Sequence, residues 1–275
     1  MSPRGGALVS AVLEVRGLAR AYGAVRAVDD VSFRVPAGGS LGIVGESGSG
    51  KTTTARIVTG LERADAGEVL VRGRLRAPSV RGRAARLHRA REVQLVFQDP
   101  LLSLDPRVPA GEAVRETLRL HFPDRDPRPR VAELMEQVGL GDREAAARPR
   151  ELSGGQRQRV AIARALAVEP AVLVLDEAVA ALDVSVQAQI LNLLAEIRAR
   201  TDIAYLFITH DLGVVRAVTD SLVVMRSGRI VEQGATATLL SAPEHAYTRL
   251  LLDSVPRPGW DPAAIAARRR PAAGH

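Results

Sequence analysis

The 275 residues suffice for one large domain, or for one core with a subdomain, and the absence of cysteine excludes disulfides, iron–sulfur clusters and thiol catalysis within the chain. No stretch approaches the roughly 18 consecutive apolar residues of a membrane-spanning helix, and no convincing signal-peptide cleavage site follows Arg4, so we expect a cytosolic protein. The net charge of +7 would permit contact with nucleic acid or anionic lipid, but aromatic residues make up only 3% of the chain, which disfavours a surface that stacks on single-stranded bases.

The first part of the chain has the patterns of short β-strands. Alternating apolar residues predict half-buried strands at 12–15 and 31–35. Tyr22 lies between them, where its ring could either pack against the protein or stack on a nucleotide base. Apolar runs at 41–44 and 67–71 predict two more strands.

The segment after the strand at 41–44 is the most informative in the sequence. Residues 45–52 read Gly-Glu-Ser-Gly-Ser-Gly-Lys-Thr, match the phosphate-binding pattern G-x-x-x-x-G-K-[ST], and precede a helix-compatible stretch. Glycines allow successive backbone N–H groups to cradle an anion, and the helix N-terminus adds partial positive charge. Lys51, the single lysine among 38 basic residues, would reach the β- and γ-phosphates, and the Thr52 hydroxyl would bind Mg²⁺. The predicted nucleotide-binding residues are Gly45, Glu46, Ser47, Gly48, Ser49, Gly50, Lys51, Thr52 and Thr53.

The middle of the chain is expected to be mainly helical. Residues 72–91 hold eight arginines and few large apolar side chains, which predicts a solvated helix and its approach. Residues 93–97 predict a buried strand that ends at Gln98. From about 99 to 165 the periodicity is helical and indicates an insert within an α/β core. Its predicted helices, with a proline-rich link at 122–129, lie at 111–120, 130–138 and 156–168.

Two later apolar runs predict central strands of a parallel sheet. The run at 171–175 ends in Asp176 and Glu177, and the run at 203–209 precedes His210. Ligands bind beyond the carboxyl ends of such strands. There Asp176 could hold Mg²⁺ through water, Glu177 could polarise an attacking water, and His210 could contact a γ-phosphate.

The C-terminal part predicts a hairpin formed by residues 221–226 and 229–232, and a poorly ordered tail beyond residue 255. We expect a nucleotide-binding domain over residues 8–253, with the helical subdomain inserted at about 99–165. A C-terminal extension would occupy residues 236–275.

Together these motifs resemble the ATP-binding subunit of ABC transporters over roughly residues 10–253. The phosphate loop, Gln98, Leu-Ser-Gly-Gly-Gln at 152–156, Asp176-Glu177, Ala-Leu-Asp at 181–183 and His210 stand in that family's order. The resemblance implies a P-loop NTPase (RecA-like) α/β core, an antiparallel β subdomain and an inserted α-helical subdomain.

The resemblance also implies roles for the site residues. Tyr22 would stack on adenine, Glu177 would act as general base, and His210 would clamp the γ-phosphate. Gln98 would sense Mg²⁺ and the attacking water, and its loop would face the membrane partner. The implied metal ligands are Thr52, Gln98 and Asp176.

A second group of residues is implied to act across a dimer. Residues of the signature segment would bind the nucleotide held by an opposing subunit, and Asp183 would contact that subunit. A single chain could then not complete a site, and two chains would dimerise head to tail around two ATP molecules. The implied signature residues are Ser153, Gly154, Gly155 and Gln156.

Finer features are similar to the oligopeptide/dipeptide/nickel importer ATPases, at residues 45–52, 96–107, 182–194 and 243–251. Such systems usually pair two different ATPase chains with two transmembrane permeases and an extracytoplasmic solute-binding protein. Without cysteine, this chain resembles the ATPase partner that lacks a C-terminal iron–sulfur site. The resemblance implies a peripheral protein on the cytoplasmic face of the cell membrane, with no nucleic-acid partner.

Three alternatives remain at this point. An exporter ATPase is disfavoured by the importer-like segments, and a soluble ABC ATPase that acts on nucleic acid or the ribosome is disfavoured because no long coiled coil or second cassette is present. A binding module without turnover is disfavoured by Glu177 and His210. Ala178 and Ala180 replace the proline and serine common in the family, which leaves their effect on turnover open.

Overall fold

The structure is a computed structural model that describes residues 11–77 and 80–254. The tail expected beyond residue 255 lies outside the described residues. Within the described ranges, none of the helices combines the length and the hydrophobicity that a membrane span requires.

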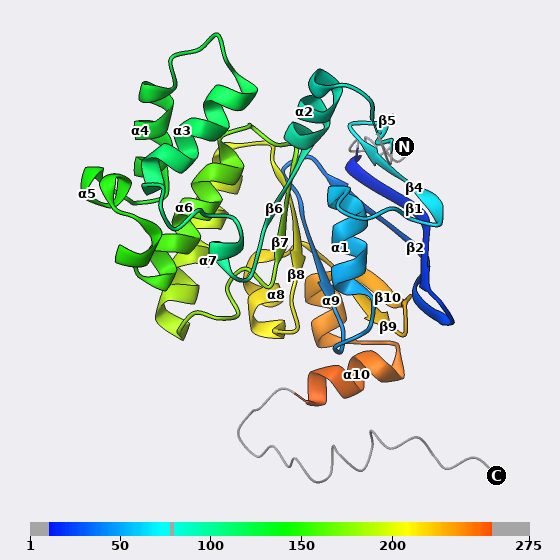
Figure 1. The fold of residues 1–275 in the computed structure, drawn as a ribbon. Helices are drawn as coiled ribbons and strands as arrows, with labels where there is room; N and C mark the ends of the chain where they lie inside the picture. The colour runs from blue at the N-terminus through cyan, green and yellow to red at the C-terminus, as the bar shows by residue number, and fades with distance from the viewer. Residues whose placement is uncertain (1–10, 78–79, 255–275) are drawn as a thin grey trace, which may run out of the picture.

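A six-stranded sheet forms the centre of the fold, in the order β10-β9-β3-β8-β7-β6 (Figure 1). Neighbouring strands from β9 to β6 are parallel, and β10 pairs antiparallel with β9. Every residue of β3 and β8 is buried, as expected for strands covered on both faces. The strands are β3 (Ser40–Val44), β6 (Val93–Val96), β7 (Val172–Asp176), β8 (Ala204–Ile208), β9 (Ser221–Arg226) and β10 (Arg229–Ala235).

A second, antiparallel sheet has the order β2-β1-β4-β5. Its strands β1 (Ala11–Tyr22) and β2 (Val25–Pro36) contain the predicted segments 12–15 and 31–35 but are much longer. The prediction was too short because register shifts interrupt the apolar alternation while cross-strand pairing continues to Tyr22 and Val25. The remaining strands are β4 (Ala66–Val71) and β5 (Arg74–Leu75).

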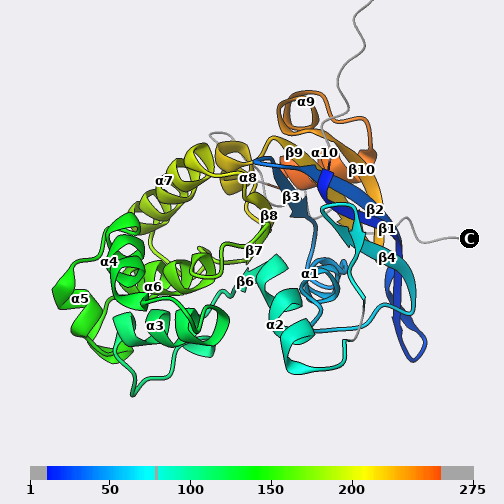
Figure 2. The same ribbon diagram turned by 90° about the horizontal axis from the view of Figure 1, so that it is seen from above.

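Helices lie on both sides of the central strands (Figures 1 and 2). Helix α1 (Lys51–Thr59) lies between the two sheets and shares their apolar core. On the other side, a separate core joins the group α3 (Ala110–His121), α4 (Pro127–Gln137), α5 (Asp142–Ala146), α6 (Gly154–Leu166) and α7 (Val184–Arg200). The fold class predicted from the sequence is therefore confirmed.

The proline-rich link predicted at 122–129 ends earlier than expected. Helix α4 begins at Pro127, because Asp126 caps it by accepting a hydrogen bond from the Arg128 N–H. Proline fits the first helical position since its missing N–H has no intrahelical partner there. Two short 3₁₀ helices, Pro100–Leu102 and Pro149–Glu151, complete this half of the molecule.

The arginine-rich segment is only partly solvated. None of the residues described in α2 (Arg83–Glu92) is buried, as predicted, but Arg76 before it is buried. Its guanidinium donates hydrogen bonds to the carbonyls of Val58 (3.1 Å) and Thr59 (2.8 Å) at the end of α1, where carbonyls lack intrahelical partners. Burial lowers the pKa of Arg76 to about 10, so it remains a cation at neutral pH. The prediction of a solvated approach is wrong for this residue.

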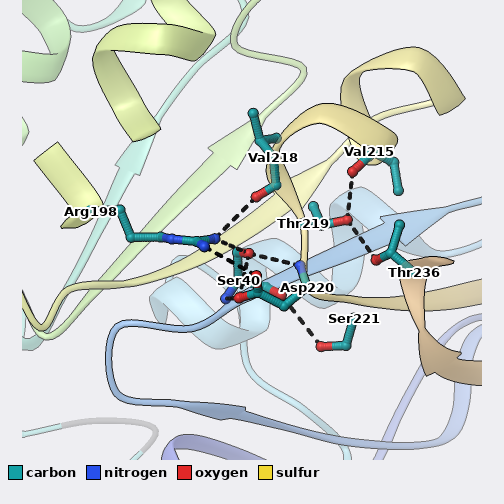
Figure 3. Close-up of polar contacts among 8 residues, drawn as sticks. All are labelled: Ser40, Arg198, Val215, Val218, Thr219, Asp220, Ser221 and Thr236. Atoms are coloured by element: carbon teal, nitrogen blue, oxygen red, sulfur yellow. Dashed lines mark hydrogen bonds and ion pairs between the residues drawn. The ribbon is translucent and has the colours of Figure 1, made fainter. Parts of the chain in front are cut away.

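A polar cluster fixes the amino edge of the central sheet (Figure 3). The Asp220 carboxylate accepts hydrogen bonds from the Ser40 N–H and hydroxyl, both at 2.9 Å, and Arg198 of α7 donates to Asp220 at 3.1 Å. This cluster ties β3, β9 and α7 together at the edge opposite the phosphate loop. The last helices are α8 (Leu212–Val218), α9 (Thr236–Ser241) and α10 (Ala246–Asp253).

Candidate nucleotide-binding site

The phosphate loop connects the buried end of β3 to α1 and is held by segments from elsewhere in the chain. A Cβ on Gly45 would lie 2.2 Å from the Met225 carbonyl oxygen, and one on Gly50 would lie 2.2 Å from the Ala27 carbonyl oxygen. Gly50 also has a φ of 101°, which disfavours other residues. The Gly228 N–H donates to the Ser49 carbonyl at 3.0 Å. The glycines are therefore required by close backbone approach as well as by the turn.

Lys51 begins α1 and is only 7% exposed. Its ammonium nitrogen donates to the carbonyls of Gly45 and Glu46, both at 2.8 Å. Burial lowers the pKa of Lys51, while the negative charges of Glu177 and Asp176 oppose that shift. The lysine thus lies inside the loop with the two carboxylates near enough to influence it.

The carboxyl ends of parallel strands bring the predicted catalytic residues to one edge. Asp176 ends β7, Glu177 follows it, and His210 follows β8. The Nδ1 atom of His210 lies 3.1 Å from a carboxylate oxygen of Glu177, so these two side chains are in contact. Burial, and then the neighbouring charge of Glu177, raises the pKa of Asp176.

Glu177 has an unusual backbone conformation for a non-glycine residue, with a φ of 49°. Its N–H donates to the Ile208 carbonyl at 2.8 Å, which extends the β7–β8 pairing by one residue. The turn therefore begins directly at Glu177 and directs the chain away from the sheet. Gln98, exposed just after β6, stands at the same edge.

Tyr22 lies at the end of β1 and is 46% exposed. Its hydroxyl donates to Glu62, and the Arg20 guanidinium carbon stands 5.0 Å from its ring centroid. The ring is thus partly exposed, and Glu62 and Arg20 hold it in place.

The signature segment lies at the start of α6. Ser153 and Gln156 form a capping box, in which each side chain bonds the other's backbone N–H, at 3.2 and 2.9 Å. A Cβ on Gly155 would lie 2.4 Å from Val186 of α7, whereas one on Gly154 would lie 3.4 Å from Leu182. The N-terminus of α7 is capped in turn by Asp183, which accepts from the Val186 N–H at 2.9 Å.

The polar groups at the sheet edge fit a magnesium ion that is shared with a nucleotide. Among the described residues, no three His, Cys, Asp or Glu side chains gather into a metal cage. Mg²⁺ in nucleotide sites is usually held by one or two side chains, by phosphate oxygens and by water. The hydroxyl of Thr52, the amide of Gln98 and the carboxylate of Asp176 are groups of that kind.

One contact of the loop was not predicted from the sequence. The Glu46 N–H donates to the Tyr247 hydroxyl of α10 at 3.0 Å, across 201 positions of sequence. The only signal available was the resemblance of residues 243–251 to a family segment, and that resemblance carried no role for Tyr247.

Comparison with known proteins identifies the family. The chain matches the ABC transporter family over residues 28–180, and the oligopeptide/dipeptide transporter C-terminal region over 231–273. It is 47% identical over 247 residues to the oligopeptide transport ATP-binding protein OppD of Mycobacterium tuberculosis (strain ATCC 25618 / H37Rv), a match that covers 90% of this chain and 40% of OppD. It is 43% identical over 260 residues to the oligopeptide transport ATP-binding protein OppF of Bacillus subtilis (strain 168), covering 91% of this chain and 84% of OppF.

Among solved structures, the chain is similar to the dimeric, ADP- and Pi-bound post-hydrolysis state of the ATP-binding cassette MJ0796. The TM-score is 0.73 at 27% identity, over 82% of this chain and 98% of that one. The chain spans less than half the length of the OppD relative. The family match nevertheless extends over more than half of the chain. The chain therefore belongs to the ABC transporter family, with a C-terminal segment that matches the C-terminal region of oligopeptide/dipeptide transporters.

Proposed function

We propose that this chain binds and hydrolyses ATP to energise the import of oligopeptides or related small solutes. The observation that carries the proposal is the convergence at one sheet edge of a phosphate loop with a buried lysine and of the contacting pair Glu177 and His210.

In the proposed complex, the loop N–H groups and the N-terminus of α1 hold the phosphates. Lys51 keeps its hydrogen bond to the Gly45 carbonyl and turns its other N–H donors toward phosphate oxygens, which offsets its burial. Adenine stacks on the partly exposed ring of Tyr22. Thr52, Gln98 and Asp176 hold Mg²⁺, which when bound neutralises charge on the phosphates.

Glu177 takes a proton from the attacking water, and its contact with His210 orients the carboxylate for that step. His210 also meets the γ-phosphate. Catalysis in this site rests mainly on positioning and on charge neutralisation.

A second ATP-binding subunit completes the site. Ser153 and Gly154 are exposed at the start of α6, which lies on the other side of the sheet from α1 (Figure 2). Their helix N-terminus, together with Gly155 and Gln156, would serve a nucleotide held by the partner, and Asp183 would contact that partner.

The proposed permease contact lies next to the Gln98 loop. A groove of about 350 Å³ separates the end of α1 and α2 from α3 and α6, and Phe97 and Leu120 line it. The exposed side chains of Leu61 and Leu120 give its rim apolar surface. One of the two permeases would dock there at the cytoplasmic face of the membrane, with an extracytoplasmic binding protein supplying solute. The names of OppD and OppF favour oligopeptides as that solute.

The test is the variant Glu177→Gln, with Glu196→Gln on the exposed face of α7 as control. Loss of the general base should lower the ATP hydrolysis rate by about 10²- to 10⁴-fold while ATP binding is retained. Light scattering with and without Mg-ATP should detect a trapped dimer. A homodimer would show that two copies suffice, and an ATP-bound monomer would point to a different partner chain. Undiminished hydrolysis would refute the role of Glu177, and absence of ATP binding would refute the proposed function.

A further inference from the structure

Helix α10 reaches the phosphate loop through the side chain of Tyr247. Tyr247 is only 3% exposed, and its hydroxyl accepts a hydrogen bond from the Glu46 N–H at 3.0 Å. The helix lies beyond the last strand and belongs to the segment that matches the oligopeptide/dipeptide C-terminal region. The contact therefore joins the C-terminal segment to the start of the loop.

The bonded N–H belongs to the same peptide group that holds Lys51. The Gly45 carbonyl and the Glu46 N–H are the two ends of one planar unit. The carbonyl end accepts from the Lys51 ammonium at 2.8 Å, and the N–H end donates to Tyr247. A rotation of this peptide would disturb both hydrogen bonds at once. The bond to Tyr247 therefore fixes the orientation of the carbonyl that accepts from Lys51.

The hydroxyl is itself held in place by the packing of α10. The ring joins an apolar cluster with Val44, at the end of the strand that leads into the loop. The Arg226 guanidinium carbon stands 4.9 Å from the ring centroid. At the start of α10, the Glu232 carboxylate accepts hydrogen bonds from the N–H groups of Glu244 (2.7 Å) and His245 (3.2 Å). These contacts hold the ring and the start of α10, and they therefore fix the position of the Tyr247 hydroxyl.

We infer that Tyr247 is a positioning residue for nucleotide binding, which acts on Lys51 through the Gly45–Glu46 peptide. The inference rests on the proposed function, since it assigns the contact to the phosphate-binding loop. A hydrogen-bonded amide is polarised, so the bond at its N–H end strengthens the acceptor at its carbonyl end. Tyr247 thereby pre-organises the loop before the phosphates arrive.

The experiment is a double-mutant cycle on the full chain, with the affinity for Mg-ADP measured by equilibrium dialysis. Tyr247→Phe removes only the hydroxyl and should weaken binding about 3- to 10-fold, the effect of one hydrogen bond. In a Lys51→Ala background the same change should weaken binding less than about twofold, because the group through which Tyr247 acts is gone. Tyr205→Phe is the matched control, since the Tyr205 hydroxyl is buried without a hydrogen-bond partner.

The outcomes separate the inference from the proposed function. Equal losses of affinity from Tyr247→Phe in both backgrounds would indicate a general structural role and overturn the inference. Unchanged affinity in Tyr247→Phe, with Lys51→Ala weakened, would overturn the inference and leave the proposed function intact. A wild-type chain that does not bind Mg-ADP would overturn both.

Discussion

The phosphate loop and the signature segment are both glycine-rich turns that open a helix, yet the fold surrounds them differently. The loop before α1 is enclosed by backbone from β2, β9 and the β9–β10 turn and by the Tyr247 side chain of α10, and it contains a buried lysine. The turn before α6 is exposed at Ser153, and its own capping box accepts hydrogen bonds from the N–H groups of Ser153 and Gln156. Similar local sequences thus give one enclosed site and one open helix end.

This difference is compatible with the proposed roles of the two segments as complementary halves of a shared site. Two carboxylates, those of Glu177 and Asp176, lie close enough to the enclosed loop to favour the charged form of Lys51. The open turn presents a helix N-terminus to the surface, where Gly154 is exposed and Gly155 packs against Val186 of α7. Each half can be altered separately, so the comparison can be tested.

Among changes to the two glycine-rich segments, the largest effect is expected from Lys51→Ala, which removes the cation from the enclosed half. ATP hydrolysis should fall about 100- to 1,000-fold, as for loss of one transition-state donor. Steady-state phosphate release measures this, with Arg200→Ala at the exposed end of α7 as control. An equal loss in the control would show that the effect is one of overall charge.

The second prediction concerns the anchor at the far end of α1. Arg76→Met should lower the free energy of unfolding by about 2–4 kcal/mol, because the carbonyls of Val58 and Thr59 at the end of α1 lose their donor and Glu92 loses one of its ion-pair partners. Urea denaturation of this variant and of Arg74→Met, an exposed neighbour, provides the comparison. If the two variants unfold at the same urea concentration, α1 is not anchored by Arg76.

A third test distinguishes the two glycines of the open half. Gly155→Ala should cost about 1–3 kcal/mol of stability, because its Cβ would lie 2.4 Å from Val186 and force α6 and α7 apart. Gly154→Ala, with its nearest atom at 3.4 Å, should stay within about 0.5 kcal/mol of the wild type. Thermal unfolding of the pair measures the difference, and equal melting temperatures would contradict the packing argument.

The smallest effect is expected from Ser153→Ala, which removes the cap of α6. Stability should fall by about 1 kcal/mol, whereas Mg-ADP binding by the single chain should be unchanged because the enclosed half is intact. Ser153→Thr keeps a capping oxygen and should restore most of the loss. Weaker Mg-ADP binding in Ser153→Ala would mean that the two halves are coupled within one chain.

Local patterns determined much of this fold. Apolar runs located β3, β7 and β8, and the strand-to-helix context located the phosphate loop, because backbone periodicity and turn chemistry are short-range properties. The capping box of α6 is equally local, since its partners are three residues apart. The order of motifs also indicated the family that the comparisons then identified.

Tertiary structure alone decided what surrounds those elements. It placed Glu177 against His210, buried Arg76 beneath α1, and brought Tyr247 to the loop. The first contact follows from the parallel pairing of β7 and β8, which no local pattern specifies. The other two join residues 17 or more positions apart, where side-chain reach and packing decide the partner. The sequence by itself thus determined which groups this protein carries, and the folded chain decided which of them meet.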